Sequence, residues 1–271
     1  MSIVGVARSY WRQAALRHFE RRLASQQPRL GLERADWHES LRDPTDFYFE
    51  CLRYFHQRLP SEIKAHRAHF QNARGDHRSF GEHPFHVMWY LLVKEFKPEN
   101  FLEIGVFRGQ TISLVALCAR LESIPCQVYG ISPFEPAGDA ARFYRADLDY
   151  YADTLAHFDQ FGLPRPALVR AYSNQPAALD LIGSRLWDLM YIDGGHEYEV
   201  VRGDWAVCSR QIKPRGLIIM DDAALNTAFT PPAFVGSRGL PGPSQVTDEI
   251  DRAQFREILQ VGHNRVFQRI A

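Results

Sequence analysis

The chain has 271 residues, and its 32 Lys or Arg balance its 32 Asp or Glu, so the formal net charge is zero. A neutral chain argues against a sequence-independent grip on nucleic acid, which needs a basic surplus to neutralise phosphates. No apolar run approaches the ~20 residues of a membrane-spanning helix, the N-terminus lacks the apolar segment of a secretory signal, and the four cysteines form no CxxC pair. We therefore expect a globular, cytoplasmic protein with neither a nucleic-acid partner nor a transmembrane segment.

The first part of the chain has the periodicity of helices. Arginines crowd residues 1–22, where a basic amphipathic helix is expected; it could be a solvated helix, an arm that joins copies into a homo-oligomer, or a targeting or membrane-surface segment. A second helix is expected over residues 47–59, and a third from Pro84 to about Lys97. We assign residues 1–83 to an N-terminal helical extension that covers the substrate or joins copies.

From residue 101 onward, short apolar runs alternate with amphipathic stretches. This alternation predicts an α/β domain over residues 84–271, with a doubly wound, mostly parallel sheet and helices on both faces. The expected strands are 101–105, 128–131, 167–170, 189–192, 217–220 and a last one near 265–270; the expected helices are 110–121, 147–161, 176–182, 198–211 and one near 247–259. Gly and Pro fill seven of the fifteen positions of 230–244, a loop that is either a lid over the ligand crevice or a surface connection.

The first strand-to-helix turn carries an acid and two glycines. Glu103 lies near the end of the strand, and Gly105 and Gly109 precede Thr111 at the start of the helix. Glycines here let the backbone approach a ligand closely, and the helix offers free N–H groups. The spacing is not the G-x-G-x-x-G of dinucleotide-binding proteins, and an acid suits a ligand with a cationic amine better than a pyrophosphate. The alternative is a purely structural turn with a solvated Glu103.

Three carboxylates follow two expected strands. Asp193 comes after one strand, and Asp221 and Asp222 come after the next. Parallel strands bring their carboxyl ends to the same edge of a sheet, where ligands bind. Carboxylates that close repel one another unless a proton or cation joins them, and hard oxygen ligands suit Mg²⁺ or another divalent ion. The alternative is that these acids merely cap helices.

His196 lies in the same loop, three residues after Asp193. A histidine beside a metal-bound hydroxyl could take its proton, because the pKa of histidine is close to working pH. The alternative is a histidine that packs at the entry to the following helix. The pairs His66/His69 and His83/His86 have spacing that could ligate zinc, but no third ligand accompanies them in the sequence.

Four segments in this order resemble the class I S-adenosylmethionine-dependent methyltransferases. They are residues 103–109, 191–198, 212–216 and 220–222, and the resemblance covers about residues 84–222. The sequence is most similar to small-molecule O-methyltransferases that bind a divalent metal, both the catechol type and the group of macrolide-sugar O-methyltransferases and cephalosporin-hydroxylase-like proteins. The resemblance implies a Rossmann-like fold over 84–271, with S-adenosylmethionine and Mg²⁺ or another divalent cation as cofactors.

The resemblance also implies a role for each matched position. Glu103, Gly105, Gly109 and Thr111 would surround the methionine part of the cofactor, and Ser173 would lie near its adenine. Asp193, Asp221 and Asp222 would bind the metal, and Asp193 and His196 would be catalytic, with His196 standing where the catechol type has a lysine. The family usually ends the second strand with an acid for the ribose; this chain has Ser132 there, with Glu135 close behind.

The predicted activity is therefore metal-assisted methylation of a small-molecule hydroxyl, on a sugar or another natural product. In this hypothesis the metal lowers the pKa of the hydroxyl, and His196 removes its proton before the oxygen attacks the sulfonium methyl. Two other functions stay open from the sequence: a non-catalytic binding or scaffold protein with this fold, and a nicotinamide-dependent oxidoreductase, which Glu103 and the missing glycine oppose.

Overall fold

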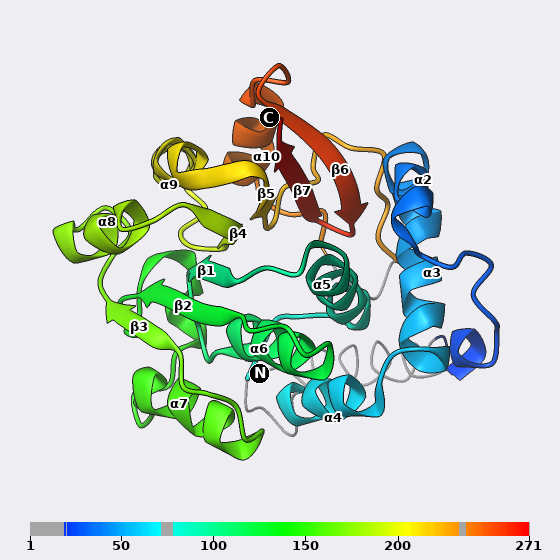
Figure 1. The fold of residues 1–271 in the computed structure, drawn as a ribbon, viewed down its shortest axis with the longest axis horizontal. Helices are drawn as coiled ribbons and strands as arrows, with labels where there is room; N and C mark the ends of the chain where they lie inside the picture. The colour runs from blue at the N-terminus through cyan, green and yellow to red at the C-terminus, as the bar shows by residue number, and fades with distance from the viewer. Residues whose placement is uncertain (1–18, 20, 72–77, 233–236, 271) are drawn as a thin grey trace, which may run out of the picture.

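The computed structural model describes residues 19, 21–71, 78–232 and 237–270, so most of the basic segment expected over residues 1–22 lies outside the described residues. Its centre is a seven-stranded sheet with the order β3-β2-β1-β4-β5-β7-β6 (Figure 1). The strands are β1 (Asn100–Ile104), β2 (Gln127–Ser132), β3 (Ala167–Arg170), β4 (Trp187–Ile192), β5 (Ile212–Met220), β6 (Phe255–Val261) and β7 (Asn264–Arg269). β1 to β5 are parallel, whereas β7 runs antiparallel to both of its neighbours.

Helices cover both faces of this sheet, as the strand–helix alternation predicts. The α-helices are α2 (His38–Arg42), α3 (Pro44–Gln57), α4 (Ser61–Phe70), α5 (His83–Phe96), α6 (Gln110–Leu121), α7 (Tyr150–Gln160), α8 (Pro176–Gly183), α9 (Tyr198–Gln211) and α10 (Pro241–Glu249), and two 3₁₀ turns are η1 (Arg34–Asp36) and η2 (Gly138–Phe143). Alternate residues of the central strands enter two separate hydrophobic clusters, because successive side chains of a strand point to opposite faces. The expected Rossmann-like, doubly wound fold is confirmed.

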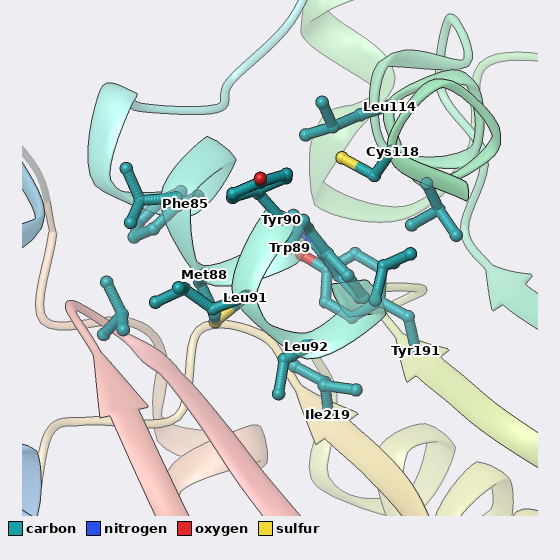
Figure 2. Packing of buried hydrophobic residues seen from close by; sticks show 14 of the residues in the cluster. Phe85, Met88, Trp89, Tyr90, Leu91, Leu92, Leu114, Cys118, Tyr191 and Ile219 are labelled. Atoms are coloured by element: carbon teal, nitrogen blue, oxygen red, sulfur yellow. The ribbon is translucent and has the colours of Figure 1, made fainter. Parts of the chain in front are cut away.

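Helix α5 is the hub of the larger cluster. It packs between α6, which carries Leu114 and Cys118, and the strands that carry Tyr191 and Ile219 (Figure 2). The ring of Trp89 meets that of Tyr191 edge-on, with centroids 5.0 Å apart. Nearly every residue of α5 is buried, because α3 covers the side that faces away from the sheet. The helix predicted from Pro84 to Lys97 therefore belongs to the centre of the molecule.

The N-terminal helices share this core. Buried apolar side chains of α3 and α4 belong to the same cluster as those of α5, α6 and the sheet. In Figure 1 the helices α2, α3 and α4 lie along the side of the molecule where α5 and the β6–β7 hairpin are, away from α8 and α9. The division at residue 83 stays a prediction about domains, but the described part of residues 1–83 packs directly on the rest.

The sequence-based elements agree best in the middle of the chain and fail near its end. The helix expected near 247–259 is wrong: α10 ends at Glu249, and 255–261 form strand β6. Phe255, Ile258 and Leu259 have helical spacing, but Gly262, with a φ of +59°, allows a tight turn in which Val261 pairs with Asn264. Part of the expected loop 230–244 is also helical, because Pro241 begins α10, where a missing N–H is tolerated. Within the described ranges, no helix is long and apolar enough to cross a membrane.

Candidate active site

The carboxyl ends of β1, β2, β4 and β5 meet at one edge of the sheet, and the predicted site residues lie there. Glu103 of β1 is only 4% exposed, and among the described residues its Oε2 has no hydrogen-bond partner. Burial, together with the charge of Asp193, raises the pKa of Glu103 well above its usual value. An acid that is buried and half-satisfied is costly, so Glu103 is prepared for a cationic or hydrogen-bond-donating ligand.

Gly105 and Gly109 shape the turn that follows β1. Gly105 has a φ of +100°, and a Cβ there would lie 1.7 Å from the backbone oxygen of Asp193. Gly109 has a φ of +77° at the N-terminus of α6, and a Cβ there would meet Thr154 at 2.7 Å. Thr111 is the second residue of α6 and is partly exposed. Glycine is therefore required at both positions, because the backbone comes close to Asp193 and to Thr154.

The same turn is held from outside by an ion pair that sequence analysis missed. The guanidinium of Arg108 donates through Nε and Nη2 to the two carboxylate oxygens of Asp153 in α7, at 2.6 and 3.2 Å. Burial would raise the pKa of Asp153, but hydrogen bonds from His157 and Arg108 lower it to about 2. Arg108 is 4% exposed, so this paired charge stabilises the backbone beside Gly109.

At the ends of β2 and β3 the chain forms a hollow of about 290 Å³. Pro133, Phe134 and Glu135 line one side, and Arg170 and Tyr172 line the other. The side chain of Glu135 accepts a hydrogen bond of 3.3 Å from the Tyr172 hydroxyl. The hollow therefore combines aromatic rings with charged side chains at the carboxyl ends of β2 and β3.

Ser132 and Ser173 lie near this hollow but make different contacts. Ser132 is buried at the end of β2, and its Oγ accepts a weak bond of 3.5 Å from the Phe134 N–H. Ser173 is hydrogen-bonded to Asp204 of α9, and burial raises the pKa of Asp204 to about 6. Ser132 thus lies at the carboxyl end of β2, where the sequence predicted a ribose contact, whereas Ser173 is hydrogen-bonded to Asp204.

The three predicted carboxylates are brought together as parallel strand ends require. The backbone N–H of Asp193 bonds to Ile104 O, and that of Asp221 to Ile192 O, at 2.9 and 3.1 Å. The carboxyl group of Asp221 is hydrogen-bonded to that of Asp193. His196 Nε2 lies 3.8 Å from Asp193 Oδ1 and 3.4 Å from Asp222 Oδ2. His196 therefore faces two of the three carboxylates.

A second histidine completes this cluster, and sequence analysis missed it. His263 lies in the β6–β7 turn, with Nε2 3.3 Å from Asp221 Oδ1 and Nδ1 3.7 Å from Asp222 Oδ1. Ligand atoms of Asp221, Asp222 and His263 all lie within 4.8 Å of one another, a spacing that could hold a metal ion. The signal in the sequence was the Gly262-His263 pair between two apolar runs, which marks a hairpin turn.

The protonation of the cluster follows from its crowding. Burial and the charge of Asp193 raise the pKa of Asp221 to about 7. Burial would lower the pKa of His263, but Asp221, Asp222 and Glu82 raise it to about 9. A positive charge is therefore favoured among these carboxylates, as a proton on His263 or as a cation.

Part of the chain is similar to known proteins. A family model described as a methyltransferase domain matches residues 102–223. An uncharacterized protein of Acanthamoeba polyphaga mimivirus is 24% identical over 152 residues, a match covering 54% of this chain and 61% of that protein. This chain thus spans less than two thirds of the length of that curated relative.

Two solved structures share the fold at low identity. The methyltransferase PaMTH1 of Podospora anserina, solved with S-adenosylhomocysteine bound, is 16% identical with a TM-score of 0.56, and the alignment covers 80% of this chain and 92% of that one. A Staphylococcus aureus protein provisionally assigned as a caffeoyl-CoA O-methyltransferase is 13% identical with a TM-score of 0.57, over 80% of this chain and 95% of that one. Residues 102–223 thus match a methyltransferase domain, and the chain has the fold of class I methyltransferases, in agreement with the resemblance that the sequence shows.

Proposed function

We propose that this protein is an S-adenosylmethionine-dependent O-methyltransferase that methylates a hydroxyl group of a small molecule, such as a sugar or another natural product, with the help of a divalent cation. The observation that carries the proposal is the position of two different sites on one sheet edge. A buried acid and a glycine turn lie at the end of β1, and the cluster of carboxylates with His196 lies at the ends of β4 and β5. Gly105 touches the Asp193 backbone, so the two sites are contiguous.

The first site fits the cofactor. Glu103 would accept a hydrogen bond from the methionine ammonium group, because its Oε2 has no partner among the described residues. The turn over Gly105 and Gly109 would leave room for the methionine part, and Ser132 and Glu135 would reach the ribose from the end of β2. The Podospora anserina protein, which binds S-adenosylhomocysteine, has the same fold.

The second site fits a divalent cation and a hydroxyl group. Asp193, Asp221 and Asp222 supply the hard oxygen donors that Mg²⁺ prefers, and a cation bound there would lower the pKa of an acceptor hydroxyl. His196 would receive the proton of that hydroxyl, since its Nε2 already lies at the rim of the carboxylates. Orientation of the oxygen toward the methyl group would supply much of the remaining rate enhancement.

Residues of the N-terminal half border the second site. Tyr48 of α3 donates a hydrogen bond to Glu82, and the ring of Phe85 at the start of α5 packs on His263 with centroids 4.8 Å apart. Aromatic side chains beside a polar cluster are suited to a small acceptor with an apolar body and a hydroxyl group. We therefore propose that Tyr48 and Phe85 help to select the acceptor, the role that sequence analysis gave to the N-terminal extension.

Calorimetry with S-adenosylmethionine tests the proposal directly. We expect saturable one-to-one binding by the full chain, and transfer of a labelled methyl group to a hydroxyl acceptor from a panel of sugars and phenols. Gly203→Ala, in the middle of α9 where a Cβ meets no atom within 4 Å, is the control that should bind normally. Absence of binding, with and without added Mg²⁺ or Mn²⁺, would contradict the proposal, and binding without any methyl transfer would favour a binding or scaffold protein.

A further inference from the structure

The β6–β7 turn brings an imidazole to the carboxylates, and this changes the chemistry of the site. We propose that His263 is itself a ligand of the bound cation, so that the site prefers a transition-metal ion such as Mn²⁺, Fe²⁺, Co²⁺ or Zn²⁺ over Mg²⁺. The inference rests on the cation site of the proposed function, but it concerns the donor set and the identity of the metal. It assigns a role to a residue outside the segments that resemble methyltransferases, since those end at residue 222.

The orientation of His263 supports this role. Its Nδ1 lies 3.1 Å from the backbone oxygen of Ser237, which can only accept, so Nδ1 carries a hydrogen. Nε2 is then directed at Asp221 Oδ1, 3.3 Å away. Metal-binding histidines commonly donate their other ring N–H to a carbonyl, which fixes the ring and makes the ligating nitrogen more basic.

The turn that carries His263 is held rigidly against β5. The backbone oxygen of His263 accepts a 2.9 Å hydrogen bond from the N–H of Ala223, the residue after Asp222. The ring of Phe85 covers the imidazole, and a Cβ at Gly262 would lie 2.8 Å from that ring. The imidazole therefore has little freedom to leave the carboxylates.

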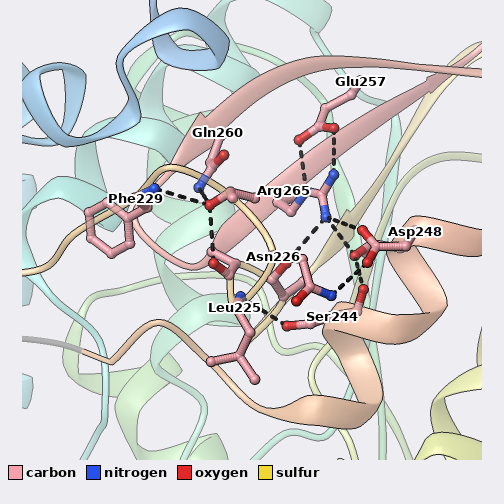
Figure 3. Close-up of polar contacts among 12 residues, drawn as sticks. Leu225, Asn226, Phe229, Ser244, Asp248, Glu257, Gln260 and Arg265 are labelled. Carbon is pink, nitrogen blue, oxygen red and sulfur yellow. Dashed lines mark hydrogen bonds and ion pairs between the residues drawn. The ribbon is translucent and has the colours of Figure 1, made fainter.

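A polar network beneath the turn adds to this rigidity. Arg265 forms two hydrogen bonds with Glu257 across the hairpin, and its Nη1 donates to Thr247 Oγ1 of α10 and to Ala223 O (Figure 3). Asn226 donates to Asp248, so the segment after β5 is tied to α10 as well. Preorganised supporting contacts of this kind are what a metal ligand needs to keep its geometry.

Two acids of the site have carboxylate oxygens that could serve as metal ligands. Asp221 Oδ1, the atom that faces His263, is buried and has no hydrogen-bond partner among the described residues. Glu103, nine-tenths buried, also has an Oε2 with no hydrogen-bond partner among the described residues, and it lies close enough to Asp193 and Asp221 for their charges to raise its pKa. Asp221, Asp222 and His263 form a mixed oxygen and nitrogen donor set. Imidazole suits transition metals, whereas carboxylate-only sites suit Mg²⁺.

The test uses the metal alone and does not depend on turnover. The full chain is stripped with a chelator, titrated with Co²⁺ and with Mg²⁺, and followed by calorimetry and visible absorption. Proton NMR of the Co²⁺ form reports a strongly shifted, exchangeable imidazole N–H when a histidine binds the metal. The variants are His263→Gln and, as a matched control, His38→Gln; the His38 side chain is 70% exposed and contacts Glu39. Circular dichroism of the stripped proteins checks that each variant is folded, and His263→Asn is a second variant suited to a hairpin turn.

We expect Co²⁺ to bind at least tenfold more tightly than Mg²⁺ and to give the shifted N–H signal. His263→Gln should raise the Kd for Co²⁺ at least tenfold, because loss of even an outer-shell partner costs about 10–100-fold, and it should abolish the shifted signal, whereas His38→Gln should keep both. An unchanged Co²⁺ Kd and spectrum in folded His263→Gln or His263→Asn overturns the proposal, as does a wild type that binds no metal or prefers Mg²⁺.

The outcome is separate from that of the proposed function. If the protein binds Co²⁺ through His263 but transfers no methyl group, the proposed function fails and the ligand assignment stands. If methyl transfer occurs and the Co²⁺ spectrum is insensitive to His263, the reverse holds.

Discussion

The β1–β2 half of the sheet edge and the β4–β5–β7 half prepare for their ligands in different ways. Around β1 the site is formed mainly by the backbone. Gly105 and Gly109 adopt positive φ, and the ion pair between Arg108 and Asp153 holds the turn in place. Around β5 the site is made of side chains, with carboxylates and two histidines crowded within a few ångströms. The first half is shaped by steric fit and the second by charge.

The difference is visible in two aspartates whose pKa values move in opposite directions. Asp153 is paired with Arg108 and His157, which lower its pKa to about 2 against the effect of burial. Asp221 is buried beside Asp193, and its pKa rises to about 7. In a structural ion pair the positive and negative charges neutralise each other, whereas a site suited to a cation has an excess of negative charge.

The largest effect is expected at Gly105. Gly105→Ala places a Cβ 1.7 Å from Asp193 O at a φ of +100°, so it should lower the free energy of unfolding by about 3–5 kcal/mol and abolish binding of S-adenosylmethionine. Urea denaturation and calorimetry measure both effects. Gly203→Ala, in a helix and in open space, should instead stabilise by about 0.5–1 kcal/mol. Similar stabilities for the two variants would show that the turn is not shaped by steric fit.

The second prediction separates the two halves by function. His196→Gln should slow methyl transfer by about 10²–10⁴-fold, the usual contribution of a general base, and leave the Kd for S-adenosylmethionine unchanged, because His196 contacts carboxylates of the β4–β5 half. Single-turnover rates and calorimetry give the two numbers. A variant that loses cofactor binding, or that retains more than a third of the rate, contradicts the assigned role.

The third prediction concerns Asp221 in metal-stripped protein. Because its pKa is about 7 in the folded chain and about 4 in the unfolded chain, the folded state binds more protons between these values. The contribution of Asp221 to stability is therefore present below pH 4 and is lost as pH rises toward 7, on the order of 1 kcal/mol per pH unit. Asp221→Asn should remove this pH-dependent decrease in stability. In the wild type, adding a divalent metal should make the decrease smaller. The free energy of unfolding, measured at several pH values, tests this prediction. If the variant and the wild type show parallel pH profiles, the prediction is wrong.

The fourth prediction has the opposite sign. The pKa of Asp153 is about 2 in the folded chain and about 4 when unfolded, so its contribution to stability is present above pH 4 and is lost as pH falls toward 2. The loss amounts to about 2 kcal/mol. Asp153→Asn should be less stable than wild type at pH 7 and should lose less on acidification. Asp159→Asn, in an exposed pair with Arg165, is a control of small effect.

The smallest effect is expected at Ser132. If its hydroxyl takes the place of the usual ribose-binding acid, Ser132→Ala should raise the Kd for S-adenosylmethionine about five- to tenfold, which corresponds to one ordinary hydrogen bond. Ser184→Ala, whose exposed hydroxyl donates to Leu181 O and accepts from Arg185 Nε, should bind as wild type does. An unchanged Kd in Ser132→Ala would contradict this role for Ser132 and would favour Glu135 as the residue that contacts the ribose.

Much of the fold could be predicted from the sequence because its signals are local. The bounds of α6, β3 and α9 agree with the expected ranges, since strand and helix periodicities differ and Gly or Pro marks their ends. The approach of Asp193 to Asp221 also follows from local reasoning, because both end parallel strands. The same reasoning failed over residues 247–259, where a short apolar run fits either period.

The sequence by itself determined which residues end the parallel strands, and hence the glycine turn at β1 and the carboxylates at β4 and β5. The tertiary structure decided what surrounds them. Strand β7 enters the sheet antiparallel to β5, so the turn before it, with His263, arrives at the edge where parallel strands finish. Likewise, Arg108 finds Asp153 only because α7 packs beside α6. Periodicity reports which face of an element is buried, whereas long-range pairing decides which distant element covers that face. The approach of His263 to Asp221 and Asp222 depends on such pairing.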